Sequence, residues 1–120
     1  MAPIWLHPIL AQLNVMQNQL NVMQNQLNNV QLKIDAASHN NMSRLRNSKV
    51  MDGLHFGTIR SEMIGPNLNG VSPLFPINLE ALNNLMLAQL NQLEIFYGVQ
   101  FVGANVITRR QAFATFIGCF

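Results

Sequence analysis

Residues 12–34 contain a tandem heptad, which constrains the fold more than any other feature of this chain. The seven residues Gln-Leu-Asn-Val-Met-Gln-Asn occur at 12–18 and again at 19–25, and a degraded copy follows from residue 26. Leu or Ile recurs every seventh residue, and a Met, Val or Ala follows each of them by three. This 3-4 spacing predicts an amphipathic helix whose apolar stripe needs a partner to cover it. The stripe consists of Ile9, Leu13, Met16, Leu20, Met23, Leu27, Val30, Ile34 and Ala37.

The flanks of this stripe are amides rather than charges. With the leucines at heptad position a, glutamine occupies the e positions and most g positions, and Lys33 is the one charged g residue. Charges at e and g normally set partner choice, so neutral flanks favour association with identical copies that depends little on salt. Unbranched Met at d, with Val15 and Val22 at c, favours three or four strands over two. Strand direction, parallel or antiparallel, stays open.

Two alternatives to self-association exist for this helix. In the first, the segment is an amphipathic helix that lies on its own domain. In the second, it is an aggregation-prone segment rich in Gln and Asn. Exact repetition of heptads favours a supercoil over the curved surface of a globular domain. The regular Leu and Met spacing argues against an unstructured amide-rich tract.

The coiled-coil helix is expected to span residues 8–46. Pro8 suits a first helical turn, where its missing N–H is not needed, and neither Gly nor Pro follows it until residue 53. Past Ile34, polar residues such as Asn41 fall on stripe positions. An eleven-residue step would continue the stripe to Leu45. Alternatively, the helix frays near residues 40–41.

Two further segments complete an all-α fold. Residues 47–77 hold four of the seven glycines and three of the five prolines, and we expect a loop-rich linker packed on the core. Residues 78–118 return to helical spacing and predict a small three-helix domain. Asn78 is its expected N-cap, and Gly98 and Gly118 are expected helix ends. The predicted order is a long N-terminal coiled-coil helix, a looped linker and a small helical C-terminal domain.

Composition limits the environment of the chain. Hydrophobic residues make up 49% of it and charged residues 10%, against about 25% charged residues in typical soluble domains. We therefore expect amide side chains to maintain solubility, or an oligomer to hide apolar surface. No apolar run reaches the roughly 18 residues of a membrane span, and residues 1–13 lack the basic start of a secretory signal. The single Cys119 suits a reducing compartment. The prediction is an intracellular protein, cytoplasmic or nuclear, without a membrane partner.

Residues that carry chemistry are scattered along the chain. His7, His39 and His55 lie in separate segments without ligand spacing, so no metal site is predicted. Cys119 is expected to be buried or merely tolerated rather than nucleophilic. Glycine-rich phosphate-binding patterns are absent, and the acidic residues are expected to be solvated. We therefore predict no catalytic residue, no cofactor and no enzymatic activity.

Basic residues indicate an alternative function, nucleic-acid binding. Net charge is only +2, but oligomerisation would multiply the charge of a basic patch. The simpler interpretation is a solvated face with positive charge at a helix C-terminus. No aromatic residues alternate with these basic residues to stack on bases. The candidate contacts are Arg44, Arg46, Lys49, Arg109 and Arg110, with Arg60 as a further basic residue.

The C-terminal segment resembles a SAP motif, a small two-helix DNA-binding element. The resemblance covers about a third of the chain and rests on Asn78-Leu-Glu-Ala-Leu, Leu90-Asn-Gln-Leu93, Tyr97-Gly98-Val99, Gly103, Arg109-Arg110 and Ile117-Gly118. It implies a helical element that reads DNA. The second helix of such motifs is rich in lysine, whereas here two arginines precede apolar residues.

The whole layout resembles a group of small mushroom (basidiomycete) proteins. In that group a Gln/Leu/Met heptad region precedes an Arg-x-x-Asn-Ser segment, here Arg44-Leu45-Arg46-Asn47-Ser48. A Pro-containing loop and a helical end starting at Phe-Pro follow, here Phe75-Pro76-Ile77-Asn78-Leu79. The resemblance implies a fungal intracellular protein with a coiled coil and a small helical domain. It carries no activity and no site residues.

Together these observations favour a homo-oligomerising scaffold that assembles through residues 8–46 and displays its C-terminal helical units. The alternative is a nucleic-acid-binding protein whose SAP-like reader is oligomerised by the coiled coil. A third hypothesis is small-ligand or lectin-like binding in apolar clefts between residues 54–76 and the helices.

Overall fold

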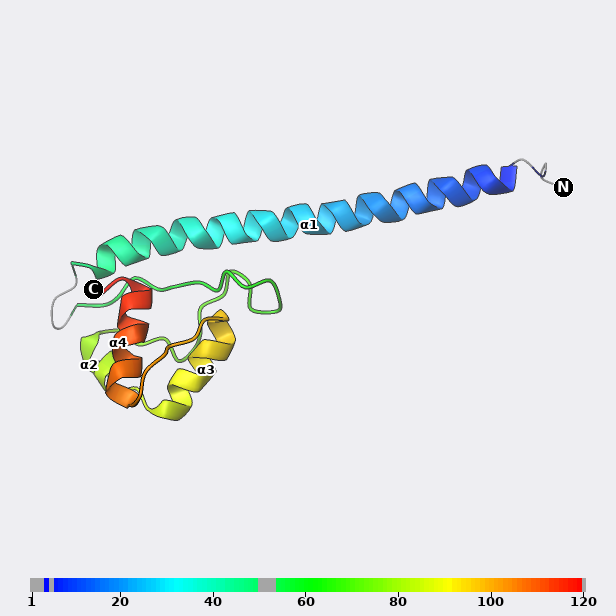
Figure 1. Cartoon of the computed structure of the whole chain (residues 1–120). Helices are drawn as coiled ribbons and strands as arrows, with labels where there is room; N and C mark the ends of the chain where they lie inside the picture. Colours follow the sequence, from blue (N-terminus) through cyan, green and yellow to red (C-terminus); the bar gives the residue numbers. More distant parts are fainter. Residues whose placement is uncertain (1–3, 5, 50–53, 120) are drawn as a thin grey trace. The chain divides into compact units, whose positions relative to one another are not determined.

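The computed structural model describes residues 4, 6–49 and 54–119 and is built from helices (Figure 1). The helices are α1 (Leu6–Asn47), α2 (Leu79–Asn83), α3 (Leu87–Tyr97) and α4 (Val106–Ile117). Over the described ranges no β-strand forms, and extended pairing is limited to isolated bridges between Arg60 and Val71 and between Ser61 and Leu68. The predicted all-α class, with a long N-terminal helix and a small helical C-terminal part, is confirmed.

Helix α1 is continuous over 42 residues. Pro8 lies in its first turn, where a proline costs no hydrogen bond, and Arg44 and Arg46 lie in its last turn, where positive charge suits the helix dipole. Asn40 and Asn41 are helical, so the alternative in which the helix frays at these residues is wrong. Tertiary contacts of Asn40, given below, hold the backbone where propensity alone would weaken it.

The chain divides into two compact units, Met1–Gln31 and Leu32–Phe120, here called the N-terminal and C-terminal units. The division lies inside α1, whereas the sequence prediction places it after residue 46. The C-terminal unit thus contains the last part of α1 together with residues 54–119. Residues 50–53, part of the predicted linker 47–77, lie outside the described residues.

The core of the C-terminal unit is aromatic. Phe113 on α4 is fully buried, and its ring contacts Phe101 edge-on at 5.2 Å and Phe75 at 6.1 Å between centroids. Edge-to-face pairs at such separations add to the stabilisation that burial alone provides. The segment before α2 contributes Phe56 and Ile59 to the same core, and Leu85 from the connection between α2 and α3 joins them. The helices contribute Leu82, Leu90, Leu93, Tyr97, Ala114 and Ile117.

Side chains and glycines set the ends of the short helices. The Asn78 Oδ1 accepts the Ala81 N–H at 2.9 Å and starts α2, and Asn105 accepts the Thr108 N–H at 2.9 Å to start α4. Gly98 and Gly118 end α3 and α4 with φ of 67° and 98°, values that favour glycine because it lacks a Cβ. The predicted cap at Asn78 and the predicted ends at both glycines are confirmed.

Within the C-terminal unit, α1 packs through a polar face. Its buried residues are Ala36, Asn40, Ser43 and Asn47, which follow one another at four, three and four residues and so share one side of the helix. The Asn47 side chain pairs with both backbone groups of Gly57, and the Asn40 side chain does the same with Arg60. The alternative in which the helix lies on its own domain therefore holds for this stretch, but through small and polar residues.

Candidate functional site

The predicted stripe is the most apolar exposed feature of α1. Leu20 is 57% exposed, Leu27 62% and Ile34 54%, although each side chain is purely hydrocarbon. The other exposed members are Ile9, Leu13, Met16, Met23 and Val30, while Ala37 is half-buried. A regular row of apolar side chains left in water is the surface feature that normally marks an association site.

Hydrogen bonds between amides accompany this stripe on the polar side of the helix. Gln17 donates to Asn21 at 3.2 Å, and Gln24 donates to Asn28 at 3.1 Å. These pairs occupy the same heptad positions in successive repeats, e and the following b. Pairs four residues apart stabilise a helix by about 0.2–0.5 kcal/mol each. The repeat thus supports helix formation through hydrogen bonds between amide side chains.

The buried polar face of α1 and the stripe occupy different heptad positions. Ala36 and Ser43 fall at c and Asn40 and Asn47 at g, whereas stripe residues fall at a and d. Inside the C-terminal unit, Ile34 remains 54% exposed while Ala36, two residues later, is fully buried. Within the C-terminal unit, docking of the helix therefore leaves Ile34 exposed, while Ala37 is half-buried.

The candidate nucleic-acid contacts do not share one environment. Arg46 and Lys49 are exposed, whereas three arginines bind protein groups. Arg44 donates from Nε to the Phe116 carbonyl at 2.8 Å and stacks on the Phe116 ring at 5.3 Å. Arg110 donates to the Leu85 carbonyl at 2.6 Å. These contacts assign Arg44 and Arg110 a structural role in linking elements of the C-terminal unit.

Arg109 forms an ion pair between α4 and α3. Its Nη2 pairs with Glu94 Oε1 on α3, and its Nε donates to the Phe101 carbonyl at 3.1 Å. The two side chains are 14% and 24% exposed. The expectation that Glu94 is simply solvated is wrong, because folding brings α4 beside α3 and places a guanidinium at this carboxylate.

His39, Ser43 and Thr58 form a polar cluster where α1 meets the loop. The His39 Nε2 lies 2.8 Å from the Thr58 carbonyl oxygen and 3.3 Å from the Ser43 Oγ. A carbonyl only accepts, so Nε2 carries the proton in this arrangement. It therefore has no lone pair with which to take a proton from Ser43, and the two side chains do not form a nucleophile–base pair.

Other chemistry-bearing groups are dispersed. In the described part of the chain, His, Cys, Asp and Glu side chains do not gather in threes. Burial raises the pKa of the Cys119 thiol above its ordinary value, which lowers the fraction of reactive thiolate at neutral pH. Among the described helices, none combines the length and hydropathy that a bilayer crossing requires.

Clefts occur in the C-terminal unit, and two of them adjoin the loop predicted to help bind a small ligand. One, of about 200 Å³, lies between residues 67–74 and α3 and is lined by Leu74, Ile95 and Phe96 among others. Another, of about 520 Å³, lies between the end of α1 and residues 56–58. A third, of about 330 Å³, lies between α2 and α4.

No family model, curated protein or solved structure matches this chain. The resemblances to basidiomycete proteins and to a SAP motif stay predictions.

Sequence reasoning missed the buried polar face of α1. Its residues recur with helical spacing, but Asn40, Ser43 and Asn47 are polar, and hydrophobic periodicity detects only apolar faces. The signal that could have revealed them is the loss of the heptad after Ile34. Where the stripe ends, a second helical period of small and amide side chains begins.

Proposed function

We propose that this chain is a homo-oligomerising scaffold protein, which assembles through the stripe of α1 and displays its C-terminal units in several copies. The observation that carries the proposal is the regular row of half-exposed Leu, Met, Ile and Val side chains along α1. A helix of this kind gains most of its stability from packing an apolar face, not from intrinsic propensity.

The size of the stripe supports association in energetic terms. Eight of its residues are about half exposed, and burying the exposed half of each contributes on the order of 1 kcal/mol. Two copies would together gain about 16 kcal/mol at that value, against a cost of about 4–15 kcal/mol for lost translational and rotational freedom. Burial of the stripe is thus large enough to drive pairing, and further strands would add to it.

The partner that fits this stripe best is a second copy of the same chain. Between residues 12 and 31, heptad positions e and g hold only glutamine, and the first charged side chain at these positions is Lys33. Identical helices therefore meet without like-charge repulsion and without a charge pattern that would select a different partner. Met at d and Val at c widen the apolar face, which favours three or four strands. Multiple C-terminal units on one bundle would bind a multivalent target with raised avidity.

The test is the native mass of the full chain at micromolar concentration, measured by light scattering or native mass spectrometry. We expect three or four copies for the wild type. A Leu20→Asp/Leu27→Asp variant places two charges in the stripe and should be monomeric. The matched control is Asn18→Asp/Asn25→Asp, which adds the same charge at heptad position f, opposite the stripe, and should keep the wild-type mass. A monomeric wild type contradicts the proposal, as does an unchanged mass for the stripe variant.

A further inference from the structure

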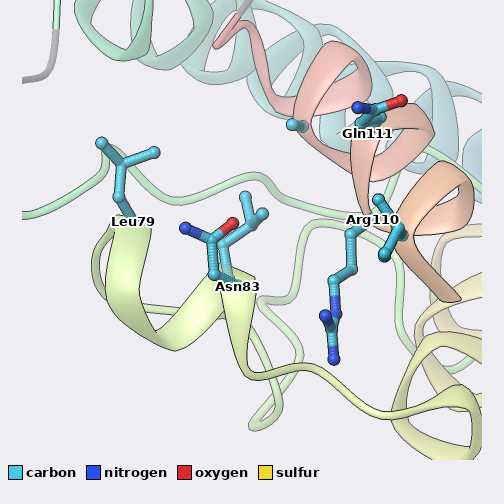
Figure 2. A pocket seen from close by; sticks show the side chains of 7 residues that line it. Leu79, Asn83, Arg110 and Gln111 are labelled. Carbon is cyan, nitrogen blue, oxygen red and sulfur yellow. The ribbon is translucent and has the colours of Figure 1, made fainter.

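The C-terminal unit contains a cleft of about 330 Å³ between α2 and α4 (Figure 2). Leu82 and Ala114, which line it, are almost completely buried, whereas Ile107 is 61% exposed. Polar side chains complete the lining on both helices. The lining residues are Leu79, Leu82, Asn83, Ile107, Arg110, Gln111 and Ala114. The cleft is thus apolar, with a single cationic side chain and no carboxylate in its lining, and its volume falls in the range of small-molecule sites.

Arg110 is held in place at this cleft by the protein itself. Its Nε donates to the Leu85 carbonyl at 2.6 Å, which fixes the guanidinium beside the segment that follows α2. No hydrogen bond or ion pair to a described residue is found for its terminal nitrogens Nη1 and Nη2. A guanidinium carries five N–H donors in a planar fork, so most of its donor capacity remains for a ligand.

The neighbouring arginine shows the contrast. Arg109 has its charge balanced by Glu94, whereas no acidic side chain lines the cleft beside Arg110. Asn83 on α2 and Arg110 on α4 lie on opposite sides of the cleft (Figure 2). An amide can donate to the same anion from the facing side. The geometry therefore offers one positive charge and a neutral donor next to an apolar surface.

We infer that this cleft binds a small monocarboxylate with an apolar chain. The carboxylate would pair with the free fork of Arg110, a planar arrangement that matches two oxygens at once. The chain would cover Leu79, Leu82 and Ile107. Octanoate is a probe of suitable size for a cleft of about 330 Å³. A phosphate monoester fits less well, because one guanidinium does not balance its charge of about −1.5 to −2.

This inference is independent of the proposed oligomerisation, and the probe is octanoate added to the full-length protein. Calorimetry should show saturable binding with one site per chain. Methyl NMR should place the largest shifts at Leu82, Ile107 and Ala114. Octanol and octylammonium share the chain but lack the negative charge, and they should bind at least about tenfold more weakly, because charged hydrogen bonds contribute that much.

Two variants separate binding from folding. Asn83→Asp changes an exposed residue, keeps the bond between Arg110 and Leu85, and places a carboxylate across the cleft. It should weaken octanoate binding at least about tenfold through repulsion and competition for the guanidinium. The control is Arg46→Gln, which removes an exposed arginine of α1 that does not line the cleft. This variant should bind octanoate with wild-type affinity. Equal affinity for octanol and octanoate, unchanged binding by Asn83→Asp, or shifts confined to stripe residues such as Leu20 would overturn the inference.

Discussion

The Asn47 side chain of α1 pairs with both backbone hydrogen-bonding groups of Gly57. The Gly57 N–H donates to Oδ1 at 2.7 Å, and Nδ2 donates to the Gly57 carbonyl at 3.0 Å. Asn40 repeats the arrangement with Arg60, at 2.6 and 2.7 Å. Seven helical residues rise about 10.5 Å, and three extended residues span about 10 Å. The spacing of the two asparagines thus matches the spacing of the two peptides, and side-chain amides act as a neighbouring strand would.

Replacement of either buried asparagine should destabilise the C-terminal unit. Asn47→Ala would remove the partners of the Gly57 N–H, the Gly57 carbonyl and the Ile117 carbonyl, and buried groups without partners cost about 1–3 kcal/mol each. We expect a loss of about 3 kcal/mol, and about 2–3 kcal/mol for Asn40→Ala. The control is Asn41→Ala, which changes an exposed neighbour on the same helix and should alter stability by less than about 0.5 kcal/mol. Urea unfolding at one protein concentration measures all three, and equal effects of the Asn40 and Asn41 variants would contradict the packing described above.

Gly57 is required by the close approach of the loop to α1. A Cβ built on Gly57 would lie 3.0 Å from the Cα, Cβ and Oγ of Ser43, so Gly57→Ala should cost about 1–3 kcal/mol. The displaced loop would also lose its bonds to Asn47. The double variant Asn47→Ala/Gly57→Ala should therefore lose clearly less stability than the two single losses added together. Additive losses in a double-mutant cycle would show that the two changes act independently.

The Tyr97 hydroxyl should make stability fall at alkaline pH. It donates to the Ile59 carbonyl at 2.7 Å, and burial raises the pKa of Tyr97 from 10.0 to about 12. Below pH 10 both folded and unfolded states keep the proton. As pH rises from about 10 to 12, the unfolded state ionises first, and the free energy of unfolding falls by up to about 1.4 kcal/mol per pH unit.

Tyr97→Phe isolates this contribution. The variant should be about 1–2 kcal/mol less stable than wild type at pH 7, because the Ile59 carbonyl loses its donor. The difference between the two proteins should shrink above pH 10, since only the wild type carries the titrating hydroxyl. Urea titrations followed by circular dichroism from pH 7 to 11 test this, and a constant difference across that range would refute it.

The ion pair of Arg109 and Glu94 should contribute modestly, while Arg109 itself matters more. Both side chains are partly exposed, so a double-mutant cycle with Glu94→Gln and Arg109→Gln should give a coupling of at most about 1 kcal/mol. Arg109→Gln should cost more than Glu94→Gln, because Nε also donates to the Phe101 carbonyl. If the two single variants lose equal stability, the bond to Phe101 contributes nothing measurable.

Charges placed on the flanks of the stripe should create the partner code that the glutamines lack. In antiparallel strands position g faces g, so Gln19→Glu/Gln26→Glu should weaken self-association at low salt, and added salt should restore it because it screens the repulsion. In parallel strands g faces e, so the glutamate variant alone should keep its mass, and an equimolar mixture with Gln17→Lys/Gln24→Lys should form mixed oligomers preferentially at low salt. Sedimentation equilibrium and native mass spectrometry at two salt concentrations measure both effects, and the absence of both responses would contradict the coiled-coil assignment.

Local rules predicted much of this fold because the relevant signals lie within a few residues. The heptad predicts a long helix from 8 to 46, and α1 spans Leu6–Asn47. The cap at Asn78 and the helix ends at Gly98 and Gly118 depend on side chains or φ values at single positions. The contacts of the arginines were harder to predict. From the sequence, Arg44, Arg109 and Arg110 are expected to be solvated cations, because only the tertiary structure brings their backbone carbonyl partners beside them.

The sequence by itself determined the helical class and the apolar stripe, since both follow from the spacing of apolar residues along a continuous segment of the chain. Only the tertiary structure decided which face of α1 packs on the C-terminal unit, because that choice depends on Asn40 and Asn47 meeting peptides 20 and 10 residues away. Hydrophobic periodicity in the sequence does not predict amide pairing of this kind, because the residues involved are polar. Such pairing requires residues 57–60 to lie within hydrogen-bonding distance of α1, and the core residues Phe56 and Ile59 hold the loop there.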